Sequence, residues 1–581
     1  MKPATDASIL AAALIVSLVW LSPSRALADE LPKDTNQIES LTPEQANKLA
    51  AEFRGVSGAK CGDLGEIDAA SYMNKCLPLN GLTSLDAATA KALAKFKSDT
   101  SNAEYYFCTL TLNGVTTLDA DTAKALAEFK GFYLCLNGLT TLDAATATAL
   151  TGFKGRRLFL GGLTTLDVDI AKTLAEFKCE QLLLNGLTTL DVDIAKTLAG
   201  FKGSALWLGG LTTLDVDIAK TLAEFKGYSL NLDGLTTLDA ATAKALAEFK
   251  GQYLALNGLT ALDADTATAL AEYEGSNLTL NGLTTLDAAA AKALAELKGQ
   301  QLYLSRLTTL DAAAAKALAE FKGEKMYLNG LTTLDAATAT ALAGSAAWNG
   351  ELPKLTTLDA ATAKGLAESK GQQLSLNGLT TLDAATAKAL ADFKGFYLRL
   401  NGLTALDATT AKALAEFKGN VLDLNGLTML DAATAEGLAE FKGPQMFLMG
   451  LTTLDAATAK PLAELKGRLY LTKAVTESFC MKNPFTPETA STWAALLQGD
   501  MSFVTALDSD DSVAIAQALA TCKGPLKLPN LKKISPKTLS ALIAKEDVEI
   551  PLIETLELIN EPDGSPTEDF IIPAGFRQQS R

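Results

Sequence analysis

The sequence predicts an α/β solenoid in which each turn of 24 residues holds one short strand and one helix. Three observations carry this prediction. The motif L-T-T-L-D and its close variants recur every 24 residues from Asp119 to Asp455, which gives fifteen copies, and a further copy at Asp86 is displaced by nine extra residues. Every copy repeats the same order of strand, turn and helix signals. One copy cannot bury its own leucines, whereas stacked copies form a continuous core.

The copy at residues 132–155 shows these signals in order. Residues 134–136, Leu-Cys-Leu, alternate like a short strand with two inward leucines. The Asn-Gly pair at 137–138 is a turn signal, because both residue types tolerate a positive φ. Asp143 is a good N-cap, since its carboxylate can accept from the first backbone amides of a helix. The helix itself is expected over 144–153.

The helix of each copy has one apolar face and one charged face. Lys124 and Glu128 are spaced i, i+4 and are expected to face water. Lys130 and Gly131 are expected to close the helix, with a cation at its negative end and a glycine able to adopt the left-handed conformation. The residues expected in the core of a typical copy are Ala123, Leu126, Ala127 and Phe129.

With these elements the chain resembles leucine-rich-repeat proteins over residues 77–472. The frame L-x-L-x-x-L-T-x-L resembles repeats of bacterial surface proteins, and A-K-A-L-A-E resembles the helices of some bacterial effector repeats. The resemblance implies a right-handed horseshoe with its strands on the concave face. Strands pair about 4.8 Å apart while helices need about 8 to 10 Å, which independently places the strands inside the curve. Asn137 directly follows L-x-L instead of standing three residues later, and this argues against an asparagine ladder like the family's.

Residues 1–28 have the features of a secretory signal peptide. Lys2 precedes an apolar run over residues 9–21, and the A-x-A pattern ends at Ala28. The run is shorter than the about 20 apolar residues that span a bilayer, so no membrane span is expected. We therefore expect export to the periplasm, the cell surface or the medium; the alternative is a buried N-terminal helix.

The remainder of the chain is expected to form four segments. Residues 29–76 form an N-terminal cap with a degenerate repeat, and residues 77–472 form the regular array of about sixteen copies. Residues 473–550 hold degenerate repeats and a C-terminal cap, and residues 551–581 form a tail that is partly disordered. Atypical ends are what a repeat array needs, because each terminal unit must cover a neighbour's apolar face.

One turn, at 345–355, breaks the pattern while keeping its length. Ser345 replaces the helix phenylalanine, Gly350 replaces a strand leucine, and Pro353 replaces the asparagine. Loss of core volume and of an amide donor predicts that this turn is the weakest of the array. It could be a decayed repeat, which we favour, or a hinge or a ligand notch.

The composition excludes several functions. The chain has no histidine, which removes the commonest general base and the main nitrogen ligand of zinc, and no nucleophile elbow, phosphate loop or metal spacing replaces it. We therefore expect no catalytic residue, no metal and no cofactor. A formal net charge of −16 argues against binding nucleic acid, because phosphate groups would be repelled.

The residue between the two strand leucines, and the rim before it, vary between copies. Aromatic residues and arginine are frequent there, and these types anchor interfaces. The competing explanation is that β-propensity favours aromatic residues on any strand face. We favour binding of a protein or a glycan on this face, with a purely structural role in the cell envelope or an extracellular matrix as the alternative. The partner-binding candidates are Phe159, Leu183, Trp207, Tyr253, Tyr303, Tyr327, Tyr397, Arg399 and Phe447.

Four of the seven cysteines lie in the flanking caps. We expect Cys61 to pair with Cys76 and Cys480 with Cys522, because an array that enters an oxidising compartment loses most by fraying at its ends. The other three cysteines are odd in number, so at least one thiol should stay free. Without a histidine partner, a catalytic cysteine is not expected.

Overall fold

The computed structural model describes residues 34–52, 75–96 and 108–560. The predicted signal peptide at 1–28 and Cys61 lie outside these residues. In the part of the chain that the structure describes, no helix is long and apolar enough to cross a membrane.

The chain divides into two compact units. The first unit comprises residues 1–237 and 248–256, and the second comprises 238–247 and 257–581. The boundary falls inside the regular array, where neither the repeat length nor the motif changes.

The first unit is a stack of strand–turn–helix repeats with an all-parallel sheet. Strands β1 to β8 pair in chain order, each in register with the next, so that Leu134 lies opposite Leu158. Its elements are η1 (Thr35–Gln37), α1 (Pro43–Glu52), β1 (Lys75–Pro78), α2 (Ala87–Leu93), β2 (Cys108–Thr111), α3 (Ala120–Ala127), β3 (Tyr133–Cys135), α4 (Ala144–Leu150), β4 (Arg157–Phe159), α5 (Val168–Ala175), β5 (Gln181–Leu183), α6 (Val192–Ala199), β6 (Ala205–Trp207), α7 (Val216–Ala223), β7 (Ser229–Asn231) and β8 (Tyr253–Ala255).

The regular part of the second unit has the same organisation. Strands β9 to β11 pair in chain order, and so do β12 to β16. Its elements are α8 (Ala240–Ala247), α9 (Ala264–Ala271), β9 (Asn277–Thr279), α10 (Ala288–Ala295), β10 (Gln301–Tyr303), α11 (Ala312–Leu318), β11 (Lys325–Tyr327), α12 (Ala336–Ala343), α13 (Ala360–Ala367), β12 (Gln373–Ser375), α14 (Ala384–Ala391), β13 (Tyr397–Arg399), α15 (Ala408–Ala415), β14 (Val421–Asp423), α16 (Ala432–Ala439), β15 (Gln445–Phe447), α17 (Ala456–Ala463) and β16 (Arg468–Tyr470).

The strands of the C-terminal repeats are shorter, and these repeats are less regular. Strands pair as β17–β19–β21 and as β18–β20, and the pairing of β21 with β19 brings part of the predicted tail into a sheet. The elements are α18 (Lys473–Lys482), α19 (Pro487–Leu496), β17 (Ala506–Leu507), α20 (Ser512–Ala520), β18 (Leu526–Lys527), β19 (Lys533–Ile534), α21 (Pro536–Ile543), β20 (Val548–Glu549), η3 (Ile553–Thr555) and β21 (Glu557–Leu558).

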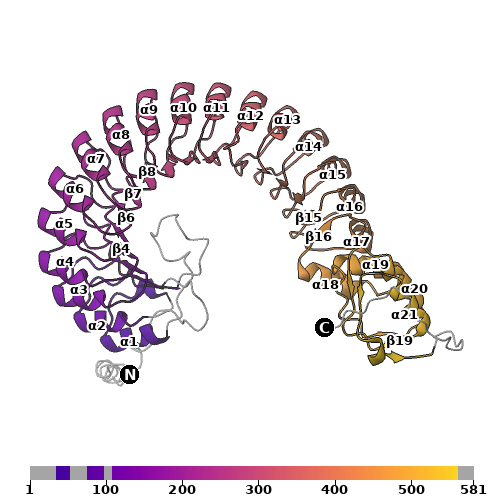
Figure 1. The fold of residues 1–581 in the computed structure, drawn as a ribbon. Coiled ribbons are helices and arrows are strands. Elements are labelled where there is room, and N and C mark those ends of the chain that lie inside the picture. Colours follow the sequence, from indigo (N-terminus) through magenta and orange to yellow (C-terminus); the bar gives the residue numbers. More distant parts are fainter. Residues whose placement is uncertain (1–33, 53–74, 97–107, 561–581) are drawn as a thin grey trace, which may run out of the picture. The chain divides into compact units, whose positions relative to one another are not determined.

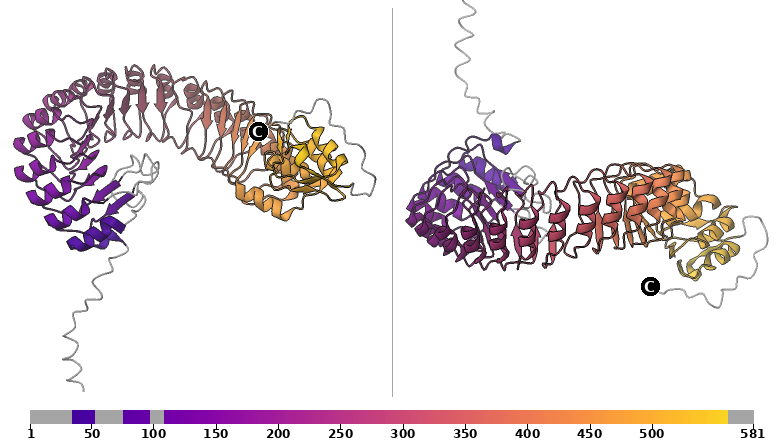
Figure 2. Two further views of the ribbon diagram at one scale, coloured as in Figure 1. Left: turned by 60° about the horizontal axis from the view of Figure 1, so that its bottom comes forward. Right: turned by 90° about the horizontal axis from the view of Figure 1, so that it is seen from above.

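The repeating unit confirms the predicted α/β solenoid of the leucine-rich-repeat type. In each unit taken alone, Figure 1 shows the strands on the inner side of the bend and the helices on the outer side. The two layers are also visible from the directions of Figure 2. Leucines from both layers fill the space between them, and Leu134, Leu136 and Leu139 of one copy are all fully buried.

The three-residue strands β3 to β16 begin one residue earlier than predicted. β3 covers Tyr133–Cys135 instead of 134–136, because the parallel pairing with β4 joins Tyr133 to Arg157 and Cys135 to Phe159. Two residues of each strand therefore point away from the core, with one inward leucine between them. The rim position predicted before the strand leucine is therefore the first residue of the strand.

The aspartate that opens each regular helix caps it, as predicted. Asp143 Oδ1 accepts a hydrogen bond of 2.7 Å from the backbone N–H of Thr146. That bond is the main cause that lowers the pKa of Asp143, and the Thr146 hydroxyl adds to it. A backbone hydrogen bond from the third helix residue lowers the pKa in the same way at Asp86, Asp119, Asp239, Asp263, Asp335, Asp359, Asp383, Asp407, Asp431 and Asp455.

The two glycines of a regular copy serve a different purpose from the one predicted. Neither Gly131 nor Gly138 has a positive φ. A Cβ on Gly138 would overlap the backbone carbonyl oxygen of Asn113 in the preceding turn, and a Cβ on Gly131 would overlap the ring of Phe129. Both positions are therefore glycine because the backbone passes too close to its neighbours for a side chain.

An asparagine ladder runs along the turns after the strands, contrary to the expectation from the displaced asparagine. Asn137 Oδ1 accepts from the backbone N–H of Gly161 at 2.8 Å, and Asn113 Oδ1 accepts from Asn137 at 3.0 Å. The bonds join equivalent positions of consecutive turns. The ladder forms because the residue after L-x-L lies directly over its counterpart 24 residues earlier.

The irregular turn at 345–355 lies between β11 and β12 and contains single bridges in place of a strand. Met326 pairs with Trp348 rather than with Gly350, and Glu351 pairs with Ser375. The buried indole of Trp348 occupies core volume that Gly350 cannot fill, and Gly350 has a φ of +75°. Whether this turn bends more easily than its neighbours remains a prediction.

The expected bridge between Cys480 and Cys522 is not formed in the structure, where both thiols are free. Cys480 lies on α18 and Cys522 follows α20, and α19, which comes between them in the chain, packs against α20. Burial raises the pKa of Cys480 to about 11 and that of Cys179 to about 12, so both thiols are protonated at neutral pH. Cys76 is buried.

Candidate functional site

The outward strand face consists of the two side chains of each strand that point away from the leucine core. In the second unit, strand pairing arranges these side chains in two columns. The inner column, at the third position of each strand, contains Tyr303, Tyr327, Arg399, Asp423, Phe447 and Tyr470. The outer column, at the first position, contains Gln301, Lys325, Gln373, Tyr397, Val421, Gln445 and Arg468.

In the first unit, two of the predicted binding residues are buried. Phe159 and Leu183 are each 5% exposed and form one cluster with Tyr133 and Cys135. This burial leaves neither side chain the exposed area that a contact with a partner requires, and corrects the prediction for both. Trp207 packs against the same cluster and is half-buried.

Tyr253, the remaining candidate of the first unit, is half-buried on β8. Its neighbour in the sheet register is Ser229 on β7.

The five candidates of the second unit lie on the outward strand face and retain exposure. Tyr303, Tyr327, Arg399 and Phe447 are half-buried, and Tyr397 is 40% exposed. The strands hold them at fixed positions in the two columns, so that they form one surface rather than scattered residues.

Two aromatic pairs mark this surface. The rings of Tyr303 and Tyr327 stack with centroids 4.3 Å apart, and those of Phe447 and Tyr470 stack at the same distance. Neighbouring strands bring each pair together, because its members are equivalent residues of consecutive turns. Stacking helps to fix the rings and is worth about 0.5–1.5 kcal/mol per pair beyond burial. The Tyr303 hydroxyl also donates to Gln301 Oε1 at 2.8 Å, and the guanidinium of Arg468 lies over the Tyr470 ring.

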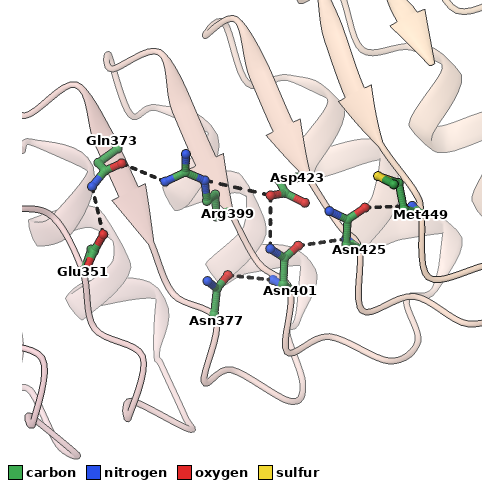
Figure 3. A network of polar contacts seen from close by, with 8 residues as sticks. All are labelled: Glu351, Gln373, Asn377, Arg399, Asn401, Asp423, Asn425 and Met449. Carbon is green, nitrogen blue, oxygen red and sulfur yellow. Dashed lines mark hydrogen bonds and ion pairs between the residues drawn. The ribbon is translucent and has the colours of Figure 1, made fainter. Parts of the chain in front are cut away.

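Between the two aromatic pairs lies a polar cluster, which we define as Glu351, Gln373, Arg399 and Asp423 (Figure 3). Gln373 Nε2 donates to Glu351 Oε1 at 3.1 Å, and Arg399 Nη1 donates to Gln373 Oε1 at 2.7 Å. Arg399 Nε lies 3.9 Å from Asp423 Oδ2. The four side chains thus form a chain of contacts across consecutive turns of the sheet.

The asparagine ladder supports the polar cluster from below the strands (Figure 3). Asn401 Nδ2 donates to Asp423 Oδ2 at 3.1 Å, while Asn401 Oδ1 accepts from the backbone N–H of Asn425 at 2.8 Å. Asp423 Oδ1 is buried and has no hydrogen-bond partner among the described residues. One amide therefore fixes the aspartate to the ladder.

Glu351 belongs to the irregular turn and is held by several amides. Its Oε2 accepts from Asn349 at 3.1 Å and from Asn329 at 3.3 Å, in addition to the bond from Gln373 to Oε1. Both carboxylate oxygens are therefore used within the protein. In the inner column, Glu351 of the irregular turn therefore stands between Tyr327 and Ser375 of the two neighbouring turns.

Arg399 uses little of its hydrogen-bonding capacity. A guanidinium group carries five N–H donors, and within the described residues the bond to Gln373 is the one hydrogen bond that the Arg399 side chain makes. Its guanidinium carbon lies 5.2 Å from the centre of the Tyr397 ring, and the side chain is 33% exposed. The ring and the amide orient the cation while its remaining donors stay available.

Sequence reasoning found Arg399 but missed Glu351, Gln373 and Asp423. The fixed period places Asp423 in the same column as Arg399, and Gln373 one column away, so their positions were accessible to alignment of the copies. Their residue types gave no signal, because aromatic residues and arginine were the types expected to anchor a partner.

Among the described residues, no group of three or more histidine, cysteine, aspartate or glutamate side chains could hold a metal ion.

Comparisons with known proteins do not identify a function. No protein-family model matches the chain, and no curated protein matches it. The chain is similar to a chain of the Toll–Spätzle complex of Drosophila, with 13% identity and a TM-score of 0.33, over 77% of this chain and 55% of that one. It is also similar to a chain of the TLR13–ssRNA13 complex, with 16% identity and a TM-score of 0.41, over 84% of this chain and 71% of that one. The chain therefore spans little more than half the length of the first, and our fold assignment depends on the repeating unit itself.

Proposed function

We propose that this chain is a non-enzymatic repeat protein that binds a protein or glycan partner through the outward strand face of its second unit. One observation carries the proposal: two stacked aromatic pairs flank a polar cluster whose members bond to one another across four turns. Tyrosine and arginine are the residue types that most often dominate binding energy at interfaces.

The competing explanation by β-propensity accounts for part of this surface only. A preference for aromatic residues on strands would explain the two aromatic pairs. It does not explain Glu351, Gln373 and Asp423, because acids and amides are depleted in strands. Half-buried polar side chains cost free energy unless they gain bonds, and here they are placed to orient Arg399.

Export by the segment at 1–28 is part of the proposal and has its own test. Cleavage after Ala28 would leave Asp29 as the first residue. Amino-terminal sequencing of the protein purified from its natural source is expected to begin at Asp29. A protein that begins at Met1 in the cytosol would contradict export.

The binding proposal is tested by affinity capture from an extract of the natural source. The full chain is compared with a triple variant, Tyr303→Ser, Tyr327→Ser and Phe447→Ser. The matched control is Met429→Ser with Met481→Ser, which removes apolar side chains that are 67% and 81% exposed away from the strand face. We expect a partner that wild type and control recover and the triple variant loses. Equal recovery by all three proteins would contradict a site on this face.

A further inference from the structure

The outward strand face of the second unit presents cations more openly than anions. Lys325 and Arg468 are exposed, and Arg399 is 33% exposed. Among the anions of the same face, Glu351 accepts amide hydrogen bonds on both oxygens, and Asp423 is only 15% exposed. A partner that approaches this face therefore meets positive charge, although the whole chain has a formal net charge of −16.

Arg399 is prepared to bind an anionic group. Gln373 has a fixed amide orientation, because its nitrogen donates to Glu351 and its oxygen must then face Arg399. The Tyr397 ring supports the guanidinium at 5.2 Å. A planar guanidinium with open N–H donors matches a carboxylate in a two-bond geometry. Pre-orientation lowers the entropy that such a contact costs.

Asp423 forms a long ion pair with this arginine but no hydrogen bond. Its Oδ2 lies 3.9 Å from Arg399 Nε, which is too long for a hydrogen bond, and the same oxygen accepts from Asn401 at 3.1 Å. Arg399 and Asp423 therefore attract each other without forming the fork of a paired arginine and carboxylate. A carboxylate from outside would make the bonds that Asp423 leaves open.

We propose that the outward strand face of the second unit binds an extended segment of a protein partner that carries one acidic residue between two apolar residues. The acid pairs with Arg399, and the apolar side chains lie against the pairs Tyr303/Tyr327 and Phe447/Tyr470. This inference rests on the proposed function and adds the chemistry of the partner. The surface favours a protein, because tyrosine, phenylalanine and arginine, which gather here at Tyr397, Phe447 and Arg399, are enriched at protein interfaces.

The sheet spacing sets the expected pattern of the segment. Tyr327 is three strand positions from Arg399, or about 14 Å, and Phe447 is two positions away, or about 10 Å. An extended chain advances about 3.3 Å per residue. Side chains of an extended chain share a face only at even spacings. The apolar residues should therefore stand about four residues from the acid on one side and about two to four on the other. A run of acids is disfavoured, since the net charge of the chain repels it at longer range.

Random twelve-residue peptides displayed on phage provide the probe. They are selected on the full wild-type chain, after depletion on the variant Tyr327→Ser with Phe447→Ser. We expect enriched peptides to share one aspartate or glutamate, with apolar residues at the two stated distances. Enrichment of peptides without an acid, or no enrichment over the variant, would overturn the inference.

Synthetic copies of the enriched peptides then test the pairing by fluorescence anisotropy. Replacing the peptide's acid with the matching amide should weaken binding to wild type at least tenfold, and Arg399→Gln should remove that difference. Arg399→Lys should restore part of it, and Asp423→Asn should strengthen binding of the acidic peptide, because a competing charge is gone. An acid preference that survives Arg399→Gln would overturn the inference.

The outcome can be separated from that of the proposed function. If affinity capture shows a partner that depends on Tyr303, Tyr327 and Phe447 while no acidic peptide is selected, the proposed function stands and the acidic segment is wrong. If the capture also fails to depend on these residues, the proposed function falls as well. Circular dichroism of every variant controls for folding.

Discussion

The side-chain oxygen of Gln373 accepts a hydrogen bond of 2.7 Å from Nη1 of Arg399, and these residues lie on neighbouring strands β12 and β13. The bond orients the guanidinium without cancelling its charge. A neutral amide is the group that can do this, because a carboxylate at the same place would form an ion pair and occupy the donors that face outward. The relationship makes Gln373 a positioning residue for Arg399.

The variant Gln373→Glu tests this role. A carboxylate at position 373 would pair with Arg399 and also repel Glu351, so we expect recovery of the partner to fall at least tenfold. Gln373→Met, which has a similar length and no charge, should cause a smaller loss. Quantitative affinity capture with both variants measures the difference. Equal losses for the two variants would show that the charge at Arg399 does not matter.

The asparagine ladder is expected to stabilise the array. Asn137→Ala would leave the backbone N–H of Gly161 without its acceptor, at a cost of about 1 kcal/mol. Asn137→Asp retains an oxygen at the same place and should lose less. The free energy of unfolding, measured by urea denaturation, distinguishes these variants. A ladder without energetic importance would give both variants the stability of wild type.

Two glycine positions are expected to respond in opposite ways to alanine. In Gly426→Ala, the new Cβ would overlap the backbone carbonyl oxygen of Asn401, and the resulting shift should cost about 1–3 kcal/mol. Gly344 has φ −67° and ψ −21° at a helix end, where alanine fits, so Gly344→Ala should gain about 0.4–1 kcal/mol. Thermal unfolding of the two variants provides the comparison. Similar effects at both positions would contradict the close approach of the turns.

The capping aspartates predict loss of stability in acid. The backbone N–H of Thr410 donates to Asp407 Oδ1 at 2.8 Å and is the main cause that lowers the pKa of Asp407 below its ordinary value of 3.8. A group whose pKa is lowered by folding contributes fully above its unfolded pKa, and the contribution is lost as the pH falls through its folded pKa. Stability should therefore decrease below about pH 4.

Asp407→Asn isolates one member of this row. Asparagine caps a helix about as well as aspartate but does not titrate, so the variant should gain relative to wild type as the pH falls below about 4. Urea denaturation at neutral pH and at about pH 3 measures this change. If the free energy of unfolding changes with pH in the same way in wild type and variant, Asp407 does not contribute to the loss of stability in acid.

Much of the repeating unit could be predicted because its signals are local. The capping role of Asp143 and the buried face of Ala123, Leu126 and Phe129 follow from residues a few positions apart. The strand limits and the role of Gly138 could not be predicted, because both depend on the preceding turn. A glycine that avoids a neighbour's carbonyl group has the same sequence signature as one with a positive φ.

The candidate site could be predicted in part. The period placed Tyr303, Tyr327 and Arg399 on one face, as observed. It could not show that Phe159 and Leu183 are buried, because equivalent positions of the repeat can have different surroundings. The polar cluster was missed because an amide or an acid at an outward position looks like an ordinary solvated residue until its neighbours are known.

Site-specific photo-cross-linking tests the central claim most directly, namely that the outward strand face of the second unit binds a partner. A benzoylphenylalanine is placed at Tyr397, which is 40% exposed on β13, and in a second protein at the exposed Lys412 on helix α15. After irradiation in an extract of the natural source, we predict a specific protein adduct from position 397 and none from position 412. An adduct from position 412 alone, or the same adducts from both positions, would contradict binding on the strand face.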